Sequence, residues 1–234
     1  MLRESFRYKT TITAILADDR EFFEPAKEAM INARLEIESE ISVNPLFLSS
    51  LVPVECETES VHVRRMADAA NIAGTGPMAA VAGTIAWAGV EAMKASGALT
   101  GVIDNGGDIA FFSDREIKIG LYAGNSEMSK KSAFILPPKK DVYGVCTSSA
   151  TVGPSISFGV ADSVTVFSGN VSLADAWATM ICNDLRSPVS KYSVETKNMG
   201  VDGVFVTLGE ESAGWGVLPE IRAAVVDTGL ITSG

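Results

Sequence analysis

The sequence predicts an α+β protein whose sheet is largely antiparallel. The strongest tight-turn signal, Asn105-Gly106, lies between two apolar runs, which is the pattern of a β-hairpin. Apolar residues at helical spacing occur elsewhere, notably after Pro25. Strand-like and helical segments do not alternate strictly, as they would in a parallel sheet built from βαβ units. We therefore expect hairpins and helices to contribute separately to the core.

The chain is expected to begin with extended segments followed by a long helix. Residues 1–9 alternate charged and apolar side chains, and residues 8–17 alternate and are β-branched, so both segments are predicted strands. After Pro25, apolar residues recur at positions 26, 30, 33, 37 and 41, which predicts an amphipathic surface helix. Asn44-Pro45 is expected to end this helix.

The next segment is predicted to be irregular before two more helices follow. Up to Pro53 we expect no regular structure, with Phe47, Leu48 and Leu51 docking onto the core. Residues 66–72 are predicted to form a short helix. Pro77 follows a glycine turn and occupies the favoured first position of a longer helix, which is expected to run to about Ser96 and to end at Gly97.

The second half of the chain is predicted to contain the hairpin, four further strands and one helix. The expected strands are residues 102–103, 109–112, 117–122, 142–147, 163–167 and 204–208. The helix is expected from about Leu173 to Asp184, and residues 124–131 read as an exposed loop. Residues 218–226 fit a helix or a strand. Because no low-complexity linker divides the chain, we expect a single domain over residues 1–234.

Composition and charge exclude several classes of function. With 234 residues, 47% of them hydrophobic and 21% charged, the chain can bury a sizeable core. The formal net charge of -10 disfavours binding to nucleic acid or to an anionic membrane, since both need clustered lysine and arginine. A small anionic molecule is still compatible, because backbone N–H groups or a metal can hold it without a basic surface.

Cysteines and the uncharged segment favour a cytoplasmic protein. The three cysteines are too few and too scattered for a disulfide framework, and they form no Cys-x-x-Cys pair. The N-terminus has no hydrophobic signal core. Residues 72–90 carry no charge, but their glycines and Pro77 make a buried core helix the better interpretation than a membrane span.

Asp175 and Thr179 form the pair with the clearest chemical interest. They are four residues apart in a predicted helix and so share one face, where their oxygens suit a hard cation such as Mg²⁺ against a phosphorylated ligand. A second interpretation is purely structural. Ser172 would cap the helix, and Asp175, three residues later, would complete a capping box. Spacing alone leaves both interpretations open.

Three other motifs are weaker signals. Residues 74–79 fit the dinucleotide-binding Gly-x-Gly-x-x-Ala pattern but lack the preceding strand, although a glycine turn before a helix can hold phosphate. His62, the only histidine, lies in an alternating stretch that predicts a strand position, and a structural role is favoured over catalysis. Cys146 is better explained as a small buried residue than as a nucleophile.

Several segments in order resemble the flavin transferase (ApbE) family. Residues 83–91, 94–109 and 117–121 look like its central helix, hairpin and next strand, and Thr147-Ser148, residues 163–166 and Ala174-Asp-Ala-Trp-Ala-Thr179 look like its later motifs. Closer still, residues 76–83 and 153–162 resemble the shorter UPF0280 branch of that superfamily. The resemblance implies a duplicated T-fold-like α+β architecture and transfer of FMN from FAD to a threonine or serine of a partner protein, with Mg²⁺.

The resemblance also implies a site. Metal ligation falls to Asp175 and Thr179, joined by the backbone carbonyl of Ala86. The remaining implied residues line a cleft for FAD, FMN or another small phosphorylated ligand: Asn105, Gly106, Gly107, Thr147 and Ser148. A metal between the phosphates would stabilise charge on the leaving phosphate.

The chain departs from the transferases at two places, so the sequence leaves catalysis open. Their His-x-x-Asp-Pro-x-Thr-Gly segment is replaced by residues 153–159, which contain no histidine, and their lysine after Ile-Ala is Trp87 here. Both changes remove groups for proton transfer or phosphate neutralisation. The alternative is a noncatalytic accessory in anaerobic sulfur assimilation and homocysteine formation, which the UPF0280 resemblance also implies. A third interpretation is an oligomeric scaffold.

Overall fold

Helices cover one face of a large antiparallel sheet, and a small sheet covers part of the other. The computed structural model describes residues 1–124, 126, 128–150, 159–186 and 188–226. The large sheet has the order β1-β2-β3-β4-β7-β8-β9-β10, and the small sheet has the order β11-β6-β5. Every strand pair in both sheets is antiparallel. This confirms the predicted fold class.

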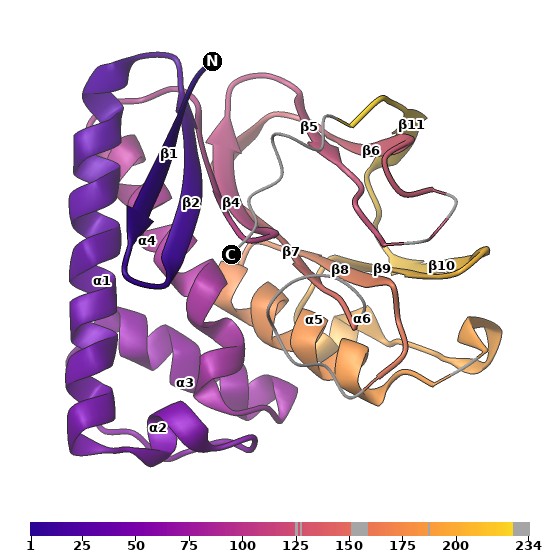
Figure 1. Ribbon diagram of the computed structural model, residues 1–234, viewed down its shortest axis with the longest axis horizontal. Helices are drawn as coiled ribbons and strands as arrows, with labels where there is room; N and C mark the ends of the chain where they lie inside the picture. The colour runs from indigo at the N-terminus through magenta and orange to yellow at the C-terminus, as the bar shows by residue number, and fades with distance from the viewer. Residues whose placement is uncertain (125, 127, 151–158, 187, 227–234) are drawn as a thin grey trace.

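The elements follow the chain in a mixed order (Figure 1). The strands are β1 (Leu2–Tyr8), β2 (Thr11–Ala17), β3 (Gly101–Asn105), β4 (Asp108–Ser113), β5 (Ile117–Gly120), β6 (Ser132–Leu136), β7 (Lys139–Ser148), β8 (Ser163–Ser168), β9 (Gly203–Leu208), β10 (Glu211–Gly216) and β11 (Glu220–Ala223). The α-helices are α1 (Phe23–Val43), α2 (Leu46–Ser49), α3 (Val61–Ala73), α4 (Val81–Ala95), α5 (Val171–Asp184) and α6 (Thr196–Met199). Short 3₁₀ turns are η1 (Arg20–Phe22), η2 (Pro77–Ala80) and η3 (Val189–Lys191).

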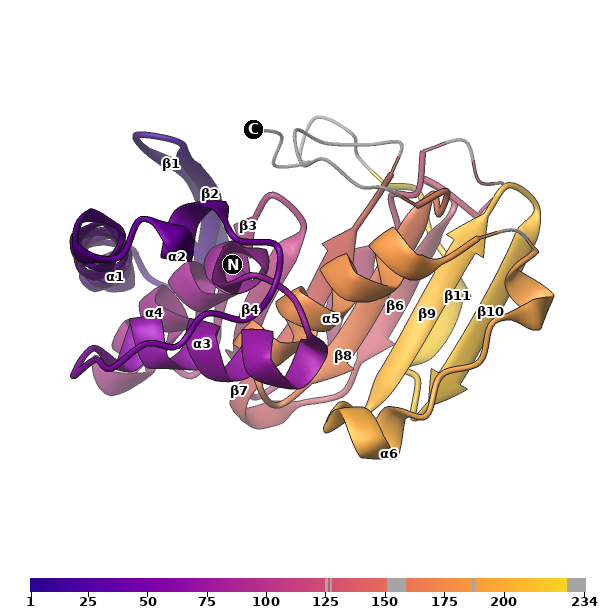
Figure 2. The ribbon, with the colours of Figure 1, turned by 90° about the horizontal axis from the view of Figure 1, so that it is seen from below.

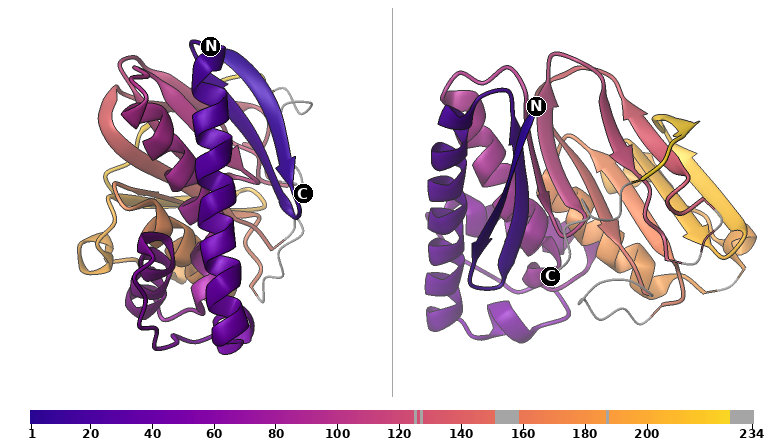
Figure 3. Two further views of the ribbon diagram at one scale, coloured as in Figure 1. Left: turned by 90° about the vertical axis from the view of Figure 1, so that its left-hand side faces the viewer. Right: turned by 45° about the horizontal axis from the view of Figure 1, so that its top comes forward.

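Two helices pack directly on the large sheet. α4 lies against β3 and β4, and α5 lies against β7 and β8, while α1 packs on α4 and α3 packs on α5. Figure 2 shows α3 and α5 in front of the central strands, and Figure 3 shows α1 running along the outside. The small sheet packs on the opposite face, where the Phe134 ring meets Phe167 and Phe205 edge-on at centroid distances of 5.0 and 5.6 Å.

The predicted hairpin is confirmed. Asn105 pairs with Asp108, and the two residues between them, Gly106 and Gly107, have φ values of 72° and 103°. Positive φ at both central positions is the requirement of the type I′ turn, which glycine meets without steric cost. The helix predicted from Pro77 is also confirmed, since Pro77 opens η2 and α4 continues to Ala95.

Two predictions at the N-terminal side need correction. The strand expected from residue 8 begins only at Thr11, because the chain turns at Lys9, whose φ is 55°. His62 was expected in a strand but lies in α3, where Ser60 accepts a hydrogen bond from the Val63 N–H and caps the helix. The alternation around His62 covers too few residues to outweigh the helical spacing that follows it.

The segment after α1 also differs from expectation. It contains the short helix α2, and only Phe47 docks as predicted, with no exposed surface. Leu48 and Leu51 are 54% and 73% exposed, so the prediction that they join the core is wrong. A single turn of helix can direct only one of its side chains fully inward.

Strands β6 and β10 were not predicted. β10 is an edge strand of alternating exposed and half-buried residues that include two glycines, so it lacks an apolar run. The ambiguous residues 218–226 contain strand β11, which pairs with β6. Within the described residues, no helix is both long and apolar enough to span a membrane.

We predict that Phe47→Ala lowers the free energy of unfolding by about 3–5 kcal/mol, because it empties a fully buried site. Leu48→Ala, on the same short helix, should change it by less than about 0.5 kcal/mol. Urea unfolding followed by circular dichroism measures both. Equal losses for the two variants would contradict this account of α2.

Candidate functional site

A large cavity opens between the helices, the hairpin turn and the small sheet. Its volume is about 1970 Å³. One end is lined by the 105–107 turn, the start of α4 and one side of α5. The other end is lined by apolar side chains from both sheets, including Ile109, Ile119 and Phe134. The cavity therefore joins a polar end to an apolar end.

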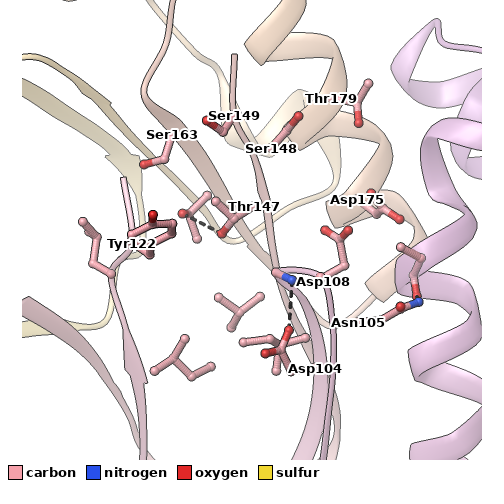
Figure 4. A pocket seen from close by; sticks show the side chains of 18 of the residues that line it. Asp104, Asn105, Asp108, Tyr122, Thr147, Ser148, Ser149, Ser163, Asp175 and Thr179 are labelled. Carbon is pink, nitrogen blue, oxygen red and sulfur yellow. Dashed lines mark hydrogen bonds between the residues drawn. The ribbon is translucent and has the colours of Figure 1, made fainter. Parts of the chain in front are cut away.

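Two carboxylates face each other at the polar end (Figure 4). Asp175 comes from the buried side of α5, and its Oδ2 accepts a hydrogen bond of 2.8 Å from the Gly83 N–H in the first turn of α4. Asp108 begins β4, directly after the glycine turn. Both residues line the cavity, so the sheet and the two helices bring together side chains that are 67 positions apart in the sequence.

Burial and mutual repulsion favour the protonated forms of this pair. Burial raises the pKa of Asp175 to about 7, although N–H groups of Gly83 and Ala82 act in the opposite direction. Burial, and then the negative charges of Asp175 and Asp104, raise the pKa of Asp108 well above its ordinary value. Two carboxylates held this way attract a cation or a shared proton.

The capping interpretation of Asp175 is wrong. The residue that caps α5 is Asn170, whose side chain accepts from the Leu173 N–H at 3.0 Å. Ser172 is fully buried, and its hydroxyl lies 2.7 Å from the Thr84 hydroxyl of α4. Asp175 lies in the second turn of α5 and accepts from another helix, so its position needs a different explanation from helix capping.

The predicted turn residues line the same cavity. Asn105 donates from Nδ2 to the Ala82 carbonyl at 3.0 Å, which ties the hairpin to α4. The Gly107 N–H donates to Asp104 at 2.9 Å, and the Gly107 carbonyl accepts from the Thr147 N–H at 3.2 Å. Gly106 also lines the cavity. These bonds hold the turn in one position beside Asp108.

Of the other predicted site residues, three line the cavity and one does not. Thr147, Ser148 and Thr179 line the cavity, with Thr179 one turn beyond Asp175 on α5, and the Thr147 hydroxyl is 2.9 Å from that of Thr165. Ala86 is fully buried in α4 and does not line the cavity. One turn earlier, Ala82 does, but its carbonyl already accepts from Asn105.

Asp108 is the residue that sequence reasoning missed. The sequence predicts it only as part of the hairpin, although a carboxylate placed directly after Gly-Gly is fixed by a tight hairpin. What the sequence could not show is that α5 carries Asp175 to the same place. The replaced residues 153–158 lie outside the described residues, and Gly159 lies just after them.

The weaker motifs do not add a catalytic group. Cys146 is fully buried, and burial with nearby negative charge raises the pKa of its thiol well above the ordinary value. His62 is not among the residues that line the cavity. The 74–79 turn does line it, but it follows a helix in an antiparallel fold, so it is not a Rossmann fingerprint.

The described residues hold no group of three or more His, Cys, Asp or Glu side chains arranged for a metal ion. Two carboxylates and a threonine hydroxyl still match the ligand preference of Mg²⁺, which usually takes one or two carboxylates and completes its octahedron with water or phosphate oxygens. These three oxygen donors therefore fit Mg²⁺ better than a metal ion that takes all of its ligands from the protein.

Two solved structures with a similar fold are ApbE proteins by name, and one of them is named a flavinyl transferase. The apo form of the Pseudomonas stutzeri flavinyl transferase ApbE matches with a TM-score of 0.56 and 14% identity, over 92% of this chain and 94% of that one. The Thermotoga maritima ApbE protein matches with a TM-score of 0.50 and 12% identity, over 95% and 97%. At these identities the likeness concerns the fold.

Sequence relatives are much more similar to this chain than these two solved structures are. A UPF0280 protein of Methanosphaerula palustris is 54% identical over 100% of this chain and 99% of its own length. One from Methanoculleus marisnigri is 52% identical over 100% and 96%. The family model described as AbpE bacteria matches residues 6–202. The chain therefore belongs to the UPF0280 family, a branch of the ApbE-like proteins.

Proposed function

We propose that the cavity binds a flavin nucleotide, FAD or FMN, or another phosphorylated ligand, with Mg²⁺ between the phosphate and the polar end. The observation that carries this proposal is the Asp108–Asp175 pair beside the ordered glycine turn. A phosphate could not approach two ionised carboxylates directly. A divalent cation would neutralise both and leave coordination positions for phosphate oxygens.

Each residue of the polar end has a separate task in this proposal. Asp175 and Asp108 would hold the ion, and Thr179 would add a hydroxyl oxygen from the next turn of α5. The Gly83 N–H orients the Asp175 carboxylate. Asn105 fixes the turn against α4 and so keeps Asp108 in place. When bound, Mg²⁺ would supply charge neutralisation for the phosphate.

The apolar end suits a ring system. Ile119, Leu121, Tyr122 and Phe134 come from the small sheet and its flanking loop and face Ile109 of the large sheet across the cavity. Ligand cavities commonly occupy about 300–1000 Å³, so this one has room for a dinucleotide-sized molecule. The Pseudomonas stutzeri protein is a flavinyl transferase by name, and a flavin nucleotide combines a flat ring with phosphate in this way.

The proposal concerns binding. Transfer of FMN to a protein hydroxyl would also need a group to accept the hydroxyl proton, and no histidine lines the cavity in the described part of the chain. The comparisons add no support for the alternative role in sulfur assimilation.

Calorimetry with FAD, FMN and Mg²⁺ tests the proposal. We expect flavin binding that strengthens with Mg²⁺. With Mg²⁺ present, Asp175→Ala should lower the flavin affinity at least about tenfold, and in chelator it should leave the affinity unchanged. Asp141→Ala, on an exposed strand position, is the matched control. Absence of binding for both flavins, with and without metal, would refute the proposal.

Asp108→Asn tests the second carboxylate of the pair. Burial and repulsion favour the protonated form of Asp108 without metal, so flavin binding in chelator should change little. The gain on adding Mg²⁺ should shrink, because the amide cannot supply the negatively charged oxygen that Asp108 would offer the ion. The same titrations measure both effects. An unchanged Mg²⁺ gain would mean that Asp108 takes no part in holding the ion.

In chelator, we predict that the free energy of unfolding falls as pH rises from about 4 to about 7. The raised pKa means that folded Asp175 keeps its proton over a range in which the unfolded chain, with a pKa of about 3.9, loses it. This contribution is full below the unfolded pKa and lost as pH rises through the folded one. Urea unfolding at several pH values should show a weaker decline for Asp175→Asn, and Mg²⁺ at pH 8 should stabilise only the parent. If the parent and Asp175→Asn lost stability equally as pH rises, the assignment of this pH dependence to Asp175 would be wrong.

A further inference from the structure

The segment around α2 exposes an unusual concentration of apolar side chains. Five large apolar residues within ten positions are between 54% and 82% exposed. They are Val43, Leu46, Leu48, Leu51 and Val52, and we call them the α2 patch. Exposed apolar residues that occur singly need no explanation, but a contiguous group marks a surface that another molecule covers.

The α2 patch is held in a fixed shape. Phe47, in its centre, is fully buried and anchors the short helix to the core. Turn hydrogen bonds from the N–H groups of Asn44, Phe47 and Ser50 to carbonyls three or four residues earlier keep the chain compact. The apolar side chains are therefore presented by an ordered backbone, which lowers the entropic cost of binding a partner.

The α2 patch borders the cavity. Leu48 and Leu51 belong to the patch and also line the cavity, together with Ser50 between them. Gly76, where the chain enters η2, lies so close to this segment that an added Cβ would be 1.8 Å from the Ser50 carbonyl oxygen. A molecule bound on the patch would thus lie at the cavity rim.

Acidic residues flank the α2 patch on both sides along the chain. From Leu35 to Val61 the sequence has six glutamates, at positions 36, 38, 40, 55, 57 and 59, and no lysine, arginine or histidine. Glu38 is paired with Lys9 and Arg34. Glu55, Glu57 and Glu59 are exposed, and their carboxylates make no ion pair with any residue that the structure describes. A molecule that binds the α2 patch must therefore combine apolar groups with positive charge.

We propose that the α2 patch binds a segment of a partner protein in which apolar side chains are flanked by lysines or arginines. Charge excludes the other occupants. A second copy of the chain would bring two acidic borders together in a protein of net charge -10, because a two-fold interface pairs the same surface with itself. Anionic lipid and nucleic acid would be repelled in the same way. The inference goes beyond ligand binding in the cavity and does not require it.

A random peptide library displayed on phage tests this proposal without flavin. The library is selected on the parent protein and counter-selected on the double variant Leu46→Ser/Leu51→Ser, and the enriched peptides are synthesised for fluorescence anisotropy. We expect enrichment of apolar residues with lysine or arginine, and a loss of at least about tenfold in affinity for the double variant. Leu99→Ser, 70% exposed at another site, is the matched control and should bind like the parent.

The charge requirement has its own variant. Glu57→Gln/Glu59→Gln should weaken the enriched peptides severalfold and flatten the salt dependence of binding, while Glu210→Gln should not. Enrichment of acidic peptides, or a pool that binds parent and double variant equally, would overturn the proposal. So would sedimentation showing a parent dimer that Leu46→Ser/Leu51→Ser dissolves, or patch-dependent binding to anionic vesicles. Flavin calorimetry on Glu57→Gln/Glu59→Gln separates this surface from the cavity, because neither residue lines the cavity and flavin affinity should match the parent.

Discussion

The close approach of α4 and α5 at Gly83 is the constraint on which the polar end of the cavity depends. A Cβ at this position would lie 3.0 Å from the Asp175 Cβ and 3.1 Å from the Val171 carbonyl oxygen, so a side chain there would force its neighbours on α5 to shift by about a few tenths of an ångström. Glycine in a helix interior costs about 1 kcal/mol relative to alanine. Here it allows the Gly83 N–H to reach Asp175 directly, and that bond sets where the carboxylate points.

The antiparallel sheet supplies the other half of the polar end. A type I′ turn with two glycines fixes Asp108 at the start of β4, and Asn105 ties the turn to the Ala82 carbonyl in the same helix that holds Asp175. The two carboxylates are therefore opposed by rigid elements and cannot move apart to relieve their repulsion. Burial raises the pKa of both carboxyls, and repulsion adds to the rise for Asp108; shifted pKa values of this kind are common at functional sites.

The α2 patch is a second surface of the molecule, and the stability of the monomer does not explain its exposed apolar side chains. Phe47 is buried as a core residue should be, yet its neighbours Leu46, Leu48 and Leu51 are exposed at the rim of the cavity. Nothing in the packing of the monomer benefits from their exposure. Under the two proposals above, the protein would combine a small anionic ligand inside the cavity with a basic partner at its rim.

Local patterns in the sequence determined the hairpin, the long helices and the family, because turn chemistry, apolar spacing and ordered motifs act over short distances. Through resemblance they also predicted that Asp175, Thr179 and the 105–107 turn form one site, and all of these residues line the same cavity. Three results needed the tertiary structure: the capping role of Asn170 in place of Ser172, the opposition of Asp108 to Asp175, and the absence of Ala86 from the cavity. Strand β10 was missed because edge strands need no apolar run. Spacing along a chain fixes which face a side chain occupies, but only packing between elements decides what that face meets.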